Sequence, residues 1–204
     1  MRRIATLLAA ACLCTACVGS VLRSDADAPA RYRLDGPAVE PGGTTLPLAI
    51  TVARPRSPLS LDTDRIAVTT PGLGFDYLAG ARWSDPAPQM LQQVLVDALA
   101  RDARFATAVA APSRVPTDLM LDVEIVRFEA AYADVGAPPT VMVEFGVNLV
   151  NVRSGRLVTS FRIAATAASA SNDRGSVVAA FEQATDQALR EAISRVAADA
   201  APKS

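Results

Sequence analysis

Residues 73–105 constrain the fold more than any other stretch, because the spacing of apolar side chains changes twice within them. Residues 75–79 alternate between two faces, which predicts a strand. From Met90 to Leu99 the apolar positions recur every three or four residues, which predicts an amphipathic helix. Residues 105–109 resume the pattern of a strand. One segment therefore supplies a strand, a helix and a second strand, enough to define one side of a core.

Both expected helices have start signals. Ser84 or Asp85 can accept hydrogen bonds from the free N–H groups of the first helix, and Pro86 suits its first turn. The second helix follows an apolar stripe over residues 177–196, and Ser176 is its expected N-cap.

The second half of the domain predicts an antiparallel meander of three strands. Apolar and polar residues alternate over residues 118–132, and the apolar parity changes between Ile125 and Val126, as a β-bulge would produce. Two further alternating segments follow, joined at Gly155, which can adopt the positive φ of a hairpin turn.

These elements predict the α+β class. With strands expected at residues 46–54 and 62–68, the fold would be a mostly antiparallel sheet with two helices packed on one face. The chain length of 204 residues favours a single domain, which we place at residues 45–200.

Histidine is absent from all 204 residues, which removes the commonest general base and metal ligand. All three cysteines lie within the first 17 residues, so the domain has no disulfide or thiolate nucleophile. A net charge of −1 argues against nucleic acid as a partner. Asp122 and Glu124 alternate with core residues and so line a solvent face, and Asp62 and Asp64 lack the rest of a calcium loop. We expect no enzyme, no metal and no cofactor.

Residues 1–16 have the order of a signal peptide: two arginines, an apolar run and small residues. The apolar run is shorter than the roughly 20 residues that span a bilayer. Leu13 to Cys17 resembles a bacterial lipobox, so Cys17 is the expected lipidation site and Cys12 the alternative. An ordinary secretory leader with incidental cysteines is the other interpretation. Residues 17–44, rich in proline, glycine and small polar residues, predict a flexible tether behind the lipidated cysteine.

Aromatic and arginine residues are the candidates for contact with a partner. Tyr32 lies in an extended piece that could pin the tether to the domain, or it is a stray aromatic. Trp83, next to Arg82, either packs beneath the first helix or is exposed as an anchor, since tryptophan and arginine are favoured at interfaces. The candidate partner-binding residues are Arg65, Tyr77, Arg82 and Trp83.

The order of these features resembles that of the ABC-type transport auxiliary lipoproteins, the lipoprotein partners of Mce transporters. The resemblance rests on the lipobox, on the Tyr-x-Leu element at Tyr32, and on LDTDRIAV and YLAGARWSD at residues 61–68 and 77–85. It continues through the hairpin NVRSGRL at residues 151–157 and the alanine-rich last helix.

The resemblance implies a non-enzymatic lipoprotein that carries a diacylglycerol thioether and an N-acyl chain such as palmitate. Val18, where an aspartate would signal inner-membrane retention, implies the periplasmic face of the outer membrane. The implied partners are an Mce-domain protein and an ABC permease system that move phospholipid, and rings among relatives allow a homo-oligomer. A regulator of a periplasmic cell-wall enzyme, similar to the activators of peptidoglycan synthases, is the alternative function.

Overall fold

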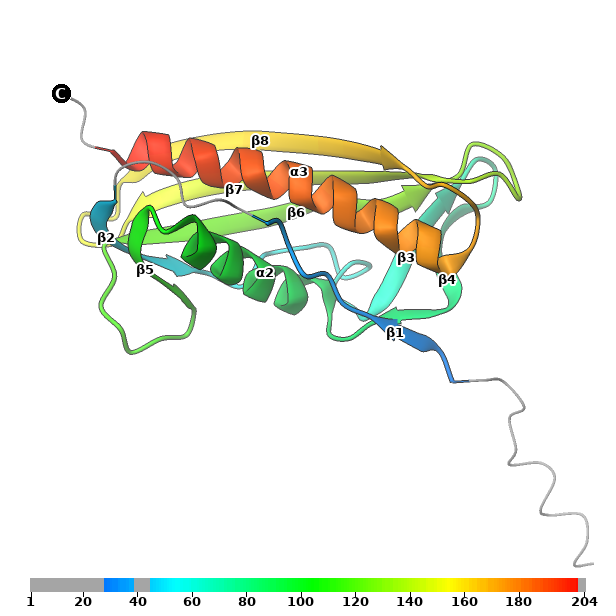
Figure 1. Cartoon of the computed structure of the whole chain (residues 1–204), viewed down its shortest axis with the longest axis horizontal. Coiled ribbons are helices and arrows are strands. Elements are labelled where there is room, and N and C mark those ends of the chain that lie inside the picture. Colours follow the sequence, from blue (N-terminus) through cyan, green and yellow to red (C-terminus); the bar gives the residue numbers. More distant parts are fainter. Residues whose placement is uncertain (1–27, 39–44, 202–204) are drawn as a thin grey trace, which may run out of the picture.

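The computed structural model describes residues 28–38 and 45–201. This part of the chain forms an eight-stranded sheet, with two helices lying together against one side of it (Figure 1), and confirms the α+β class. The elements, in chain order, are β1 (Ala30–Tyr32), β2 (Leu46–Val52), β3 (Arg65–Thr70), β4 (Gly74–Trp83), α2 (Ala87–Asp102), β5 (Phe105–Ala110), β6 (Leu119–Ala131), β7 (Thr140–Asn151), β8 (Leu157–Ala168) and α3 (Arg174–Ala200).

The sheet is arranged around β6. Along one edge β6 pairs antiparallel with β7, which in turn pairs antiparallel with β8. Along its other edge β6 pairs in parallel with β2 near its start and with β3 near its end. Beyond β6 the sheet therefore splits into two arms, one formed by β2 and β5 and the other by β3, β4 and β1.

The expectation of a mostly antiparallel sheet is wrong, because four of the seven strand pairs are parallel. Alternating hydrophobicity reports the two faces of a strand but says nothing about its direction. The chain passes through β3, β4 and α2 between β2 and β5, a crossover long enough to bring those two strands together in parallel.

The expected meander of β6, β7 and β8 is confirmed, and so are its two irregular points. The register between β6 and β7 shifts between Ile125 and Arg127, where the sequence changes parity. Gly155 adopts a φ of 65° in the turn between β7 and β8, and its N–H donates to the carbonyl of Asn151 at 2.9 Å.

Both predicted helix caps are wrong. Ser84 and Asp85 bond to each other, and the first N–H of α2 is satisfied instead by the carbonyl of Thr63 at 3.0 Å. The N-cap of α3 is Asp173, whose carboxylate accepts from the Ser176 N–H at 3.0 Å, so Ser176 is the donor rather than the cap. Hydroxyl groups of Ser171 and Ser176, which donate to this carboxylate, hold the pKa of Asp173 below its ordinary value.

The core lies between the sheet and the two helices. Trp83, Phe128 and Phe181 meet at its centre, with ring centroids 5.0 to 5.7 Å apart. Along α3, buried alanines face the sheet, and their small side chains let the helix lie close to the strands. In the described part of the chain no helix is long and apolar enough to cross a bilayer.

Candidate functional site

Trp83 belongs to the core and not to the surface. Its side chain is 0% exposed and packs edge-on against Phe181 and at a tilt against Phe128. Successive residues of a strand point to opposite faces, so the inward direction of Trp83 sends the neighbouring Arg82 outward. Trp83 is thus a core residue, which excludes it from the candidate partner-binding residues.

The other three candidates share the outward face of β3 and β4. Arg65 pairs in register with Arg82, and Arg82 pairs in register with Arg31 of β1, so three arginines form a row across three neighbouring strands. Paired residues on adjacent strands point to the same side of a sheet. Tyr77 joins this row, because the Arg65 guanidinium lies over its ring at 3.6 Å from the centroid. We name these four residues the arginine face.

One carboxylate serves two of the three arginines. Arg82 donates to Asp64 at 2.6 Å, and Arg31 approaches the other oxygen of the same carboxylate at 3.6 Å. Three guanidinium groups against one carboxylate leave this surface with a formal charge of +2. All of these side chains are at least partly exposed, so the charge faces solvent. The arrangement suits an anionic partner.

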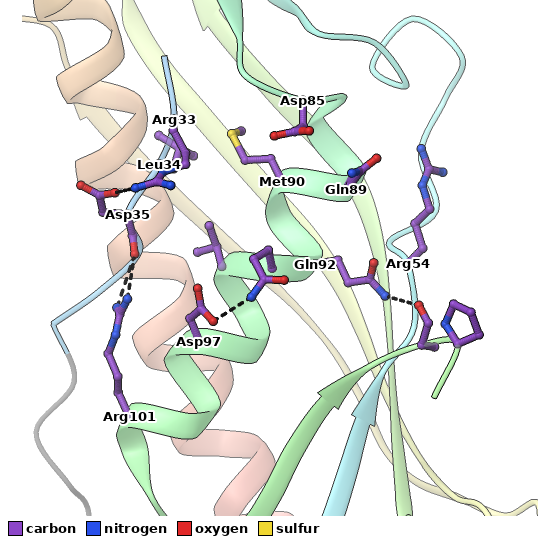
Figure 2. A pocket seen from close by; sticks show the side chains of 14 residues that line it. Arg33, Leu34, Asp35, Arg54, Asp85, Gln89, Met90, Gln92, Asp97 and Arg101 are labelled. Carbon is purple, nitrogen blue, oxygen red and sulfur yellow. Dashed lines mark hydrogen bonds and ion pairs between the residues drawn. The ribbon is translucent and has the colours of Figure 1, made fainter. Parts of the chain in front are cut away.

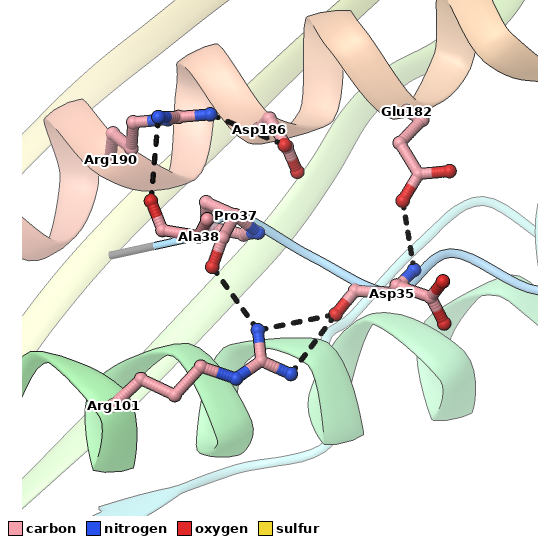
Figure 3. Close-up of polar contacts among 7 residues, drawn as sticks. All are labelled: Asp35, Pro37, Ala38, Arg101, Glu182, Asp186 and Arg190. Carbon is pink, nitrogen blue, oxygen red and sulfur yellow. Dashed lines mark hydrogen bonds and ion pairs between the residues drawn. The ribbon is translucent and has the colours of Figure 1, made fainter. Parts of the chain in front are cut away.

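Residues 33–38, named the strap, cross the two helices (Figure 3). Arg101 of α2 donates to two backbone carbonyls of the strap, at 3.1 and 3.3 Å. From the other side, Glu182 of α3 accepts from a strap N–H at 3.0 Å, and Arg190 donates to a strap carbonyl at 3.4 Å. Side chains of both helices thus hold the strap, and these polar contacts are made to its backbone.

The strap also contributes to the core. Leu34 is 2% exposed and Pro37 is buried. Gly36 has a φ of +74°, and a Cβ placed there would lie 2.6 Å from the Val94 side chain, so the position requires glycine. The strap and β1 therefore belong to the folded domain, which extends to the N-terminal side of residue 45, the start predicted from the sequence. Tyr32, part of β1 and packed against the core, does pin this segment.

A groove of about 650 Å³ lies between the strap, α2 and the segment after β2 (Figure 2). Gln92 forms part of its wall and donates through Nε2 to two backbone carbonyls, each at 2.9 Å. Arg54, on the opposite side, pairs with Asp62 at 2.5 Å. Charged and amide side chains make up most of the lining, so the groove suits a hydrated polar segment better than an acyl chain.

Of the carboxylates on the strands, Glu124 is exposed, as expected from the sequence, and three others are bound to arginines. Each makes an ion pair of 3.1 Å or less with an arginine side chain: Asp122 with Arg56, Glu129 with Arg127 and Glu144 with Arg162. Within residues 28–38 and 45–201, no three metal-ligating side chains come together. Cys17 and Cys12, the two candidate lipidation sites, lie outside the described residues.

Sequence reasoning missed the residues that hold the strap. The spacing of apolar residues marks Arg101, Glu182 and Arg190 only as polar positions off the apolar stripes of the two helices. Arg101 lies 66 residues from its bonded partner Asp35 in the chain, and Glu182 lies 147 residues away, so no local pattern reports these contacts. Gln92 carried a weak signal, since it is a polar residue within a helix whose neighbours are mostly buried.

Fold and site together define a class of protein: a small α+β domain with a mixed sheet and an N-terminal segment strapped across two helices. A sequence model of the family described as ABC-type transport auxiliary lipoprotein component matches residues 32–193. The protein belongs to this family of transport auxiliary lipoproteins. The match begins at the last residue of β1 and ends within α3, so it includes the strap, α2 and most of α3.

Two solved structures illustrate the fold among other proteins. Protein XCC0632 from Xanthomonas campestris is 28% identical, with a TM-score of 0.74 over 83% of this chain and 96% of that chain. Hypothetical protein CT253 from Chlamydia trachomatis is 11% identical, with a TM-score of 0.51 over 74% of this chain and 96% of that chain, and shows similarity of fold alone. No curated protein matches the sequence.

Proposed function

We propose that the protein is the lipid-anchored auxiliary subunit of an Mce-type ABC transport system that moves phospholipids or other hydrophobic molecules. The observation that carries the proposal is membership of the auxiliary family over residues 32–193, together with the lipobox-like sequence that ends at Cys17. ATP hydrolysis and the permease belong to other subunits, and this chain contributes binding surfaces and no catalysis.

The proposed location is the periplasmic face of the outer membrane. A diacylglycerol thioether and an N-acyl chain on Cys17 would supply more than one buried chain, which is enough for stable anchoring. Val18 supports the outer membrane, because the residue after the modified cysteine is not the aspartate that retains lipoproteins at the inner membrane.

The strap limits how far the domain can move from its anchor. The first described strand begins at Ala30, 13 residues after Cys17, and 13 extended residues span at most about 45 Å. A free tether up to residue 44 would have allowed roughly twice that distance. The domain therefore stays close to the membrane that holds it, and the Mce assembly has to extend across the periplasm to reach it.

Of the candidate partner-binding residues, Arg65, Tyr77 and Arg82 form one exposed, charged surface, which suits an anionic partner. Self-association of the subunit stays a prediction, to be measured by light scattering of the purified protein.

The test is affinity purification of the tagged protein from membranes of its own host. We expect an Mce-domain protein to be recovered, and we expect acyl chains to be lost in Cys17→Ala but retained in Cys12→Ala, as measured by intact mass. Recovery of a penicillin-binding protein in place of the Mce subunit would support the cell-wall alternative and refute the transport role.

A further inference from the structure

Exposed apolar side chains gather along the β3–β4 hairpin. Leu73, at the turn, is 74% exposed and Phe75 is 43% exposed. Phe75 packs edge-on against Tyr77, with ring centroids 5.3 Å apart. The Tyr77 hydroxyl donates to the carbonyl of Ser60 at 3.1 Å, which brings the loop carrying Leu59, 90% exposed, beside the hairpin. Apolar side chains grouped in this way on a surface mark a binding site.

On the outward face of the hairpin, with Asp76 pointing to the other face, the side chains change character in a fixed order. Leu73 lies at the tip, the aromatic pair follows, and Arg65 stacks on the second ring. Arg65 lies five residues from the end of β3, or about 17 Å of extended strand from the tip. The same order is found at a bilayer surface. Apolar side chains enter the acyl boundary, aromatic rings lie among the headgroups, and arginines contact the phosphates.

The chain enters the domain at this surface. Arg31, in the row of arginines, lies 14 residues after Cys17, and 14 residues span at most about 50 Å. In Figure 1, β1, β3 and β4 lie toward one end of the domain, while the C-terminal end of α3 lies toward the other. The described chain therefore starts at the end of the molecule that carries the arginine face.

We infer that the arginine face and the adjoining apolar side chains, Leu59, Leu73 and Phe75, lie against anionic phospholipid headgroups of the bilayer that holds the anchor. The charge of +2 is complementary to such a surface, and the short chain before β1 brings the two together. The inference rests on the proposed anchor at Cys17 for its geometry. Contact at this end turns the opposite end, with the exposed Leu157 of the β7–β8 hairpin, toward the periplasm.

The test separates this contact from the lipid anchor. The chain starting at residue 17 and carrying Cys17→Ser, which has no acyl chain, is mixed with phosphatidylcholine vesicles with and without phosphatidylglycerol, and the bound fraction is measured by flotation. We compare Arg65→Glu with Arg153→Glu, the same charge change in the exposed turn between β7 and β8. A second pair, Leu73→Ser and Leu157→Ser, compares exposed apolar residues at the two ends.

We expect binding only when phosphatidylglycerol is present, a reduction of at least about fivefold in the partition coefficient for Arg65→Glu, and weakening as salt is raised. Leu73→Ser should also weaken binding, and the variants at the far end should bind like the parent. The emission of Trp83, the single tryptophan, confirms that each variant is folded.

Equal binding to uncharged vesicles, or equal losses at the two ends, would overturn the inference. It is also overturned if Arg65→Glu binds vesicles normally but fails to recover the Mce subunit, which would make the face a protein interface. Absence of acyl chains from wild-type Cys17 would instead count against the proposed anchor, and it would leave the vesicle comparison, made without that anchor, unaffected.

Discussion

Replacing Gly36 by alanine tests whether the strap is seated as the structure shows. The substitution has two costs. A non-glycine residue at a φ of +74° costs about 1–2 kcal/mol. The added Cβ would also lie 2.6 Å from Val94 Cγ1, and Val94 is buried, so relieving the overlap means moving packed side chains at about 1–3 kcal/mol. We expect the free energy of unfolding to fall by roughly 2–5 kcal/mol in total.

Gly155 supplies the matched control. It also has a positive φ, 65°, but no atom lies within 4 Å of the position its Cβ would occupy. Gly155→Ala should therefore cost only the backbone part, about 1–2 kcal/mol. A double-mutant cycle combines Gly36→Ala with Val94→Ala, which removes the atom that the new Cβ would meet. In the Val94→Ala background, Gly36→Ala should lower the free energy of unfolding by about 1–3 kcal/mol less than in the parent.

The assay is urea unfolding followed by Trp83 fluorescence, combined with limited trypsin digestion at Arg33, which begins the strap. If the strap detaches before the domain unfolds, Gly36→Ala will be cleaved at Arg33 much faster than the parent while the main transition moves little. Equal stability losses in Gly36→Ala and Gly155→Ala, with no change in cleavage, would show that the strap does not lie against α2.

Three further predictions concern the core, the groove and the pH dependence. Trp83→Ala should lower the free energy of unfolding by about 3–5 kcal/mol, and Trp83→Phe by clearly less, as measured by urea unfolding followed by circular dichroism. Gln92→Leu should cost about 1–3 kcal/mol by the same measurement, because two backbone carbonyls at the ends of β2 and β5 lose their shared donor. Burial raises the pKa of Asp186 above 3.8, although two nearby arginines oppose the shift. The folded state therefore holds this proton more tightly than the unfolded chain, and stability falls as pH rises through the folded-state pKa. Asp186→Asn should remove this loss of stability. If the free energy of unfolding of Asp186→Asn changed with pH in parallel with that of the parent above pH 3.8, the raised pKa of Asp186 would be contradicted.

Several local features could be predicted because their cause is local. The parity change after Ile125 reports the β-bulge directly, since one extra residue reverses the facing of every side chain beyond it. The positive φ of Gly155 and the buried stripe of α3 likewise follow from residue type and spacing. The resemblance to the auxiliary lipoproteins is confirmed by the family match, and it rests on several short motifs in their order along the chain.

Other features depend on partners that are distant in the sequence. The predicted cap of α2 was wrong because the first N–H of this helix donates to a loop carbonyl and not to a neighbouring side chain. The predicted strand direction was wrong because β2 and β3 pair in parallel with a distant strand: Ile50 pairs with Leu119 and Val68 with Ala130, each more than 60 residues later. An alternating pattern specifies which side chains of a strand are buried. The same pattern is compatible with either strand direction and with several choices of neighbouring strand.

The arginine face and the strap show most clearly which features follow from local sequence and which depend on the fold. Residue spacing alone predicts that Arg82 and Trp83 face opposite ways, because successive strand residues must do so. Only the packed molecule decides that Trp83 faces inward, that Arg31 and Arg65 line up beside Arg82, and that residues 33–38 lie across α2 and α3. Periodicity is a property of neighbouring residues, whereas the arginine face and the strap arise from contacts between segments that the folded core brings together.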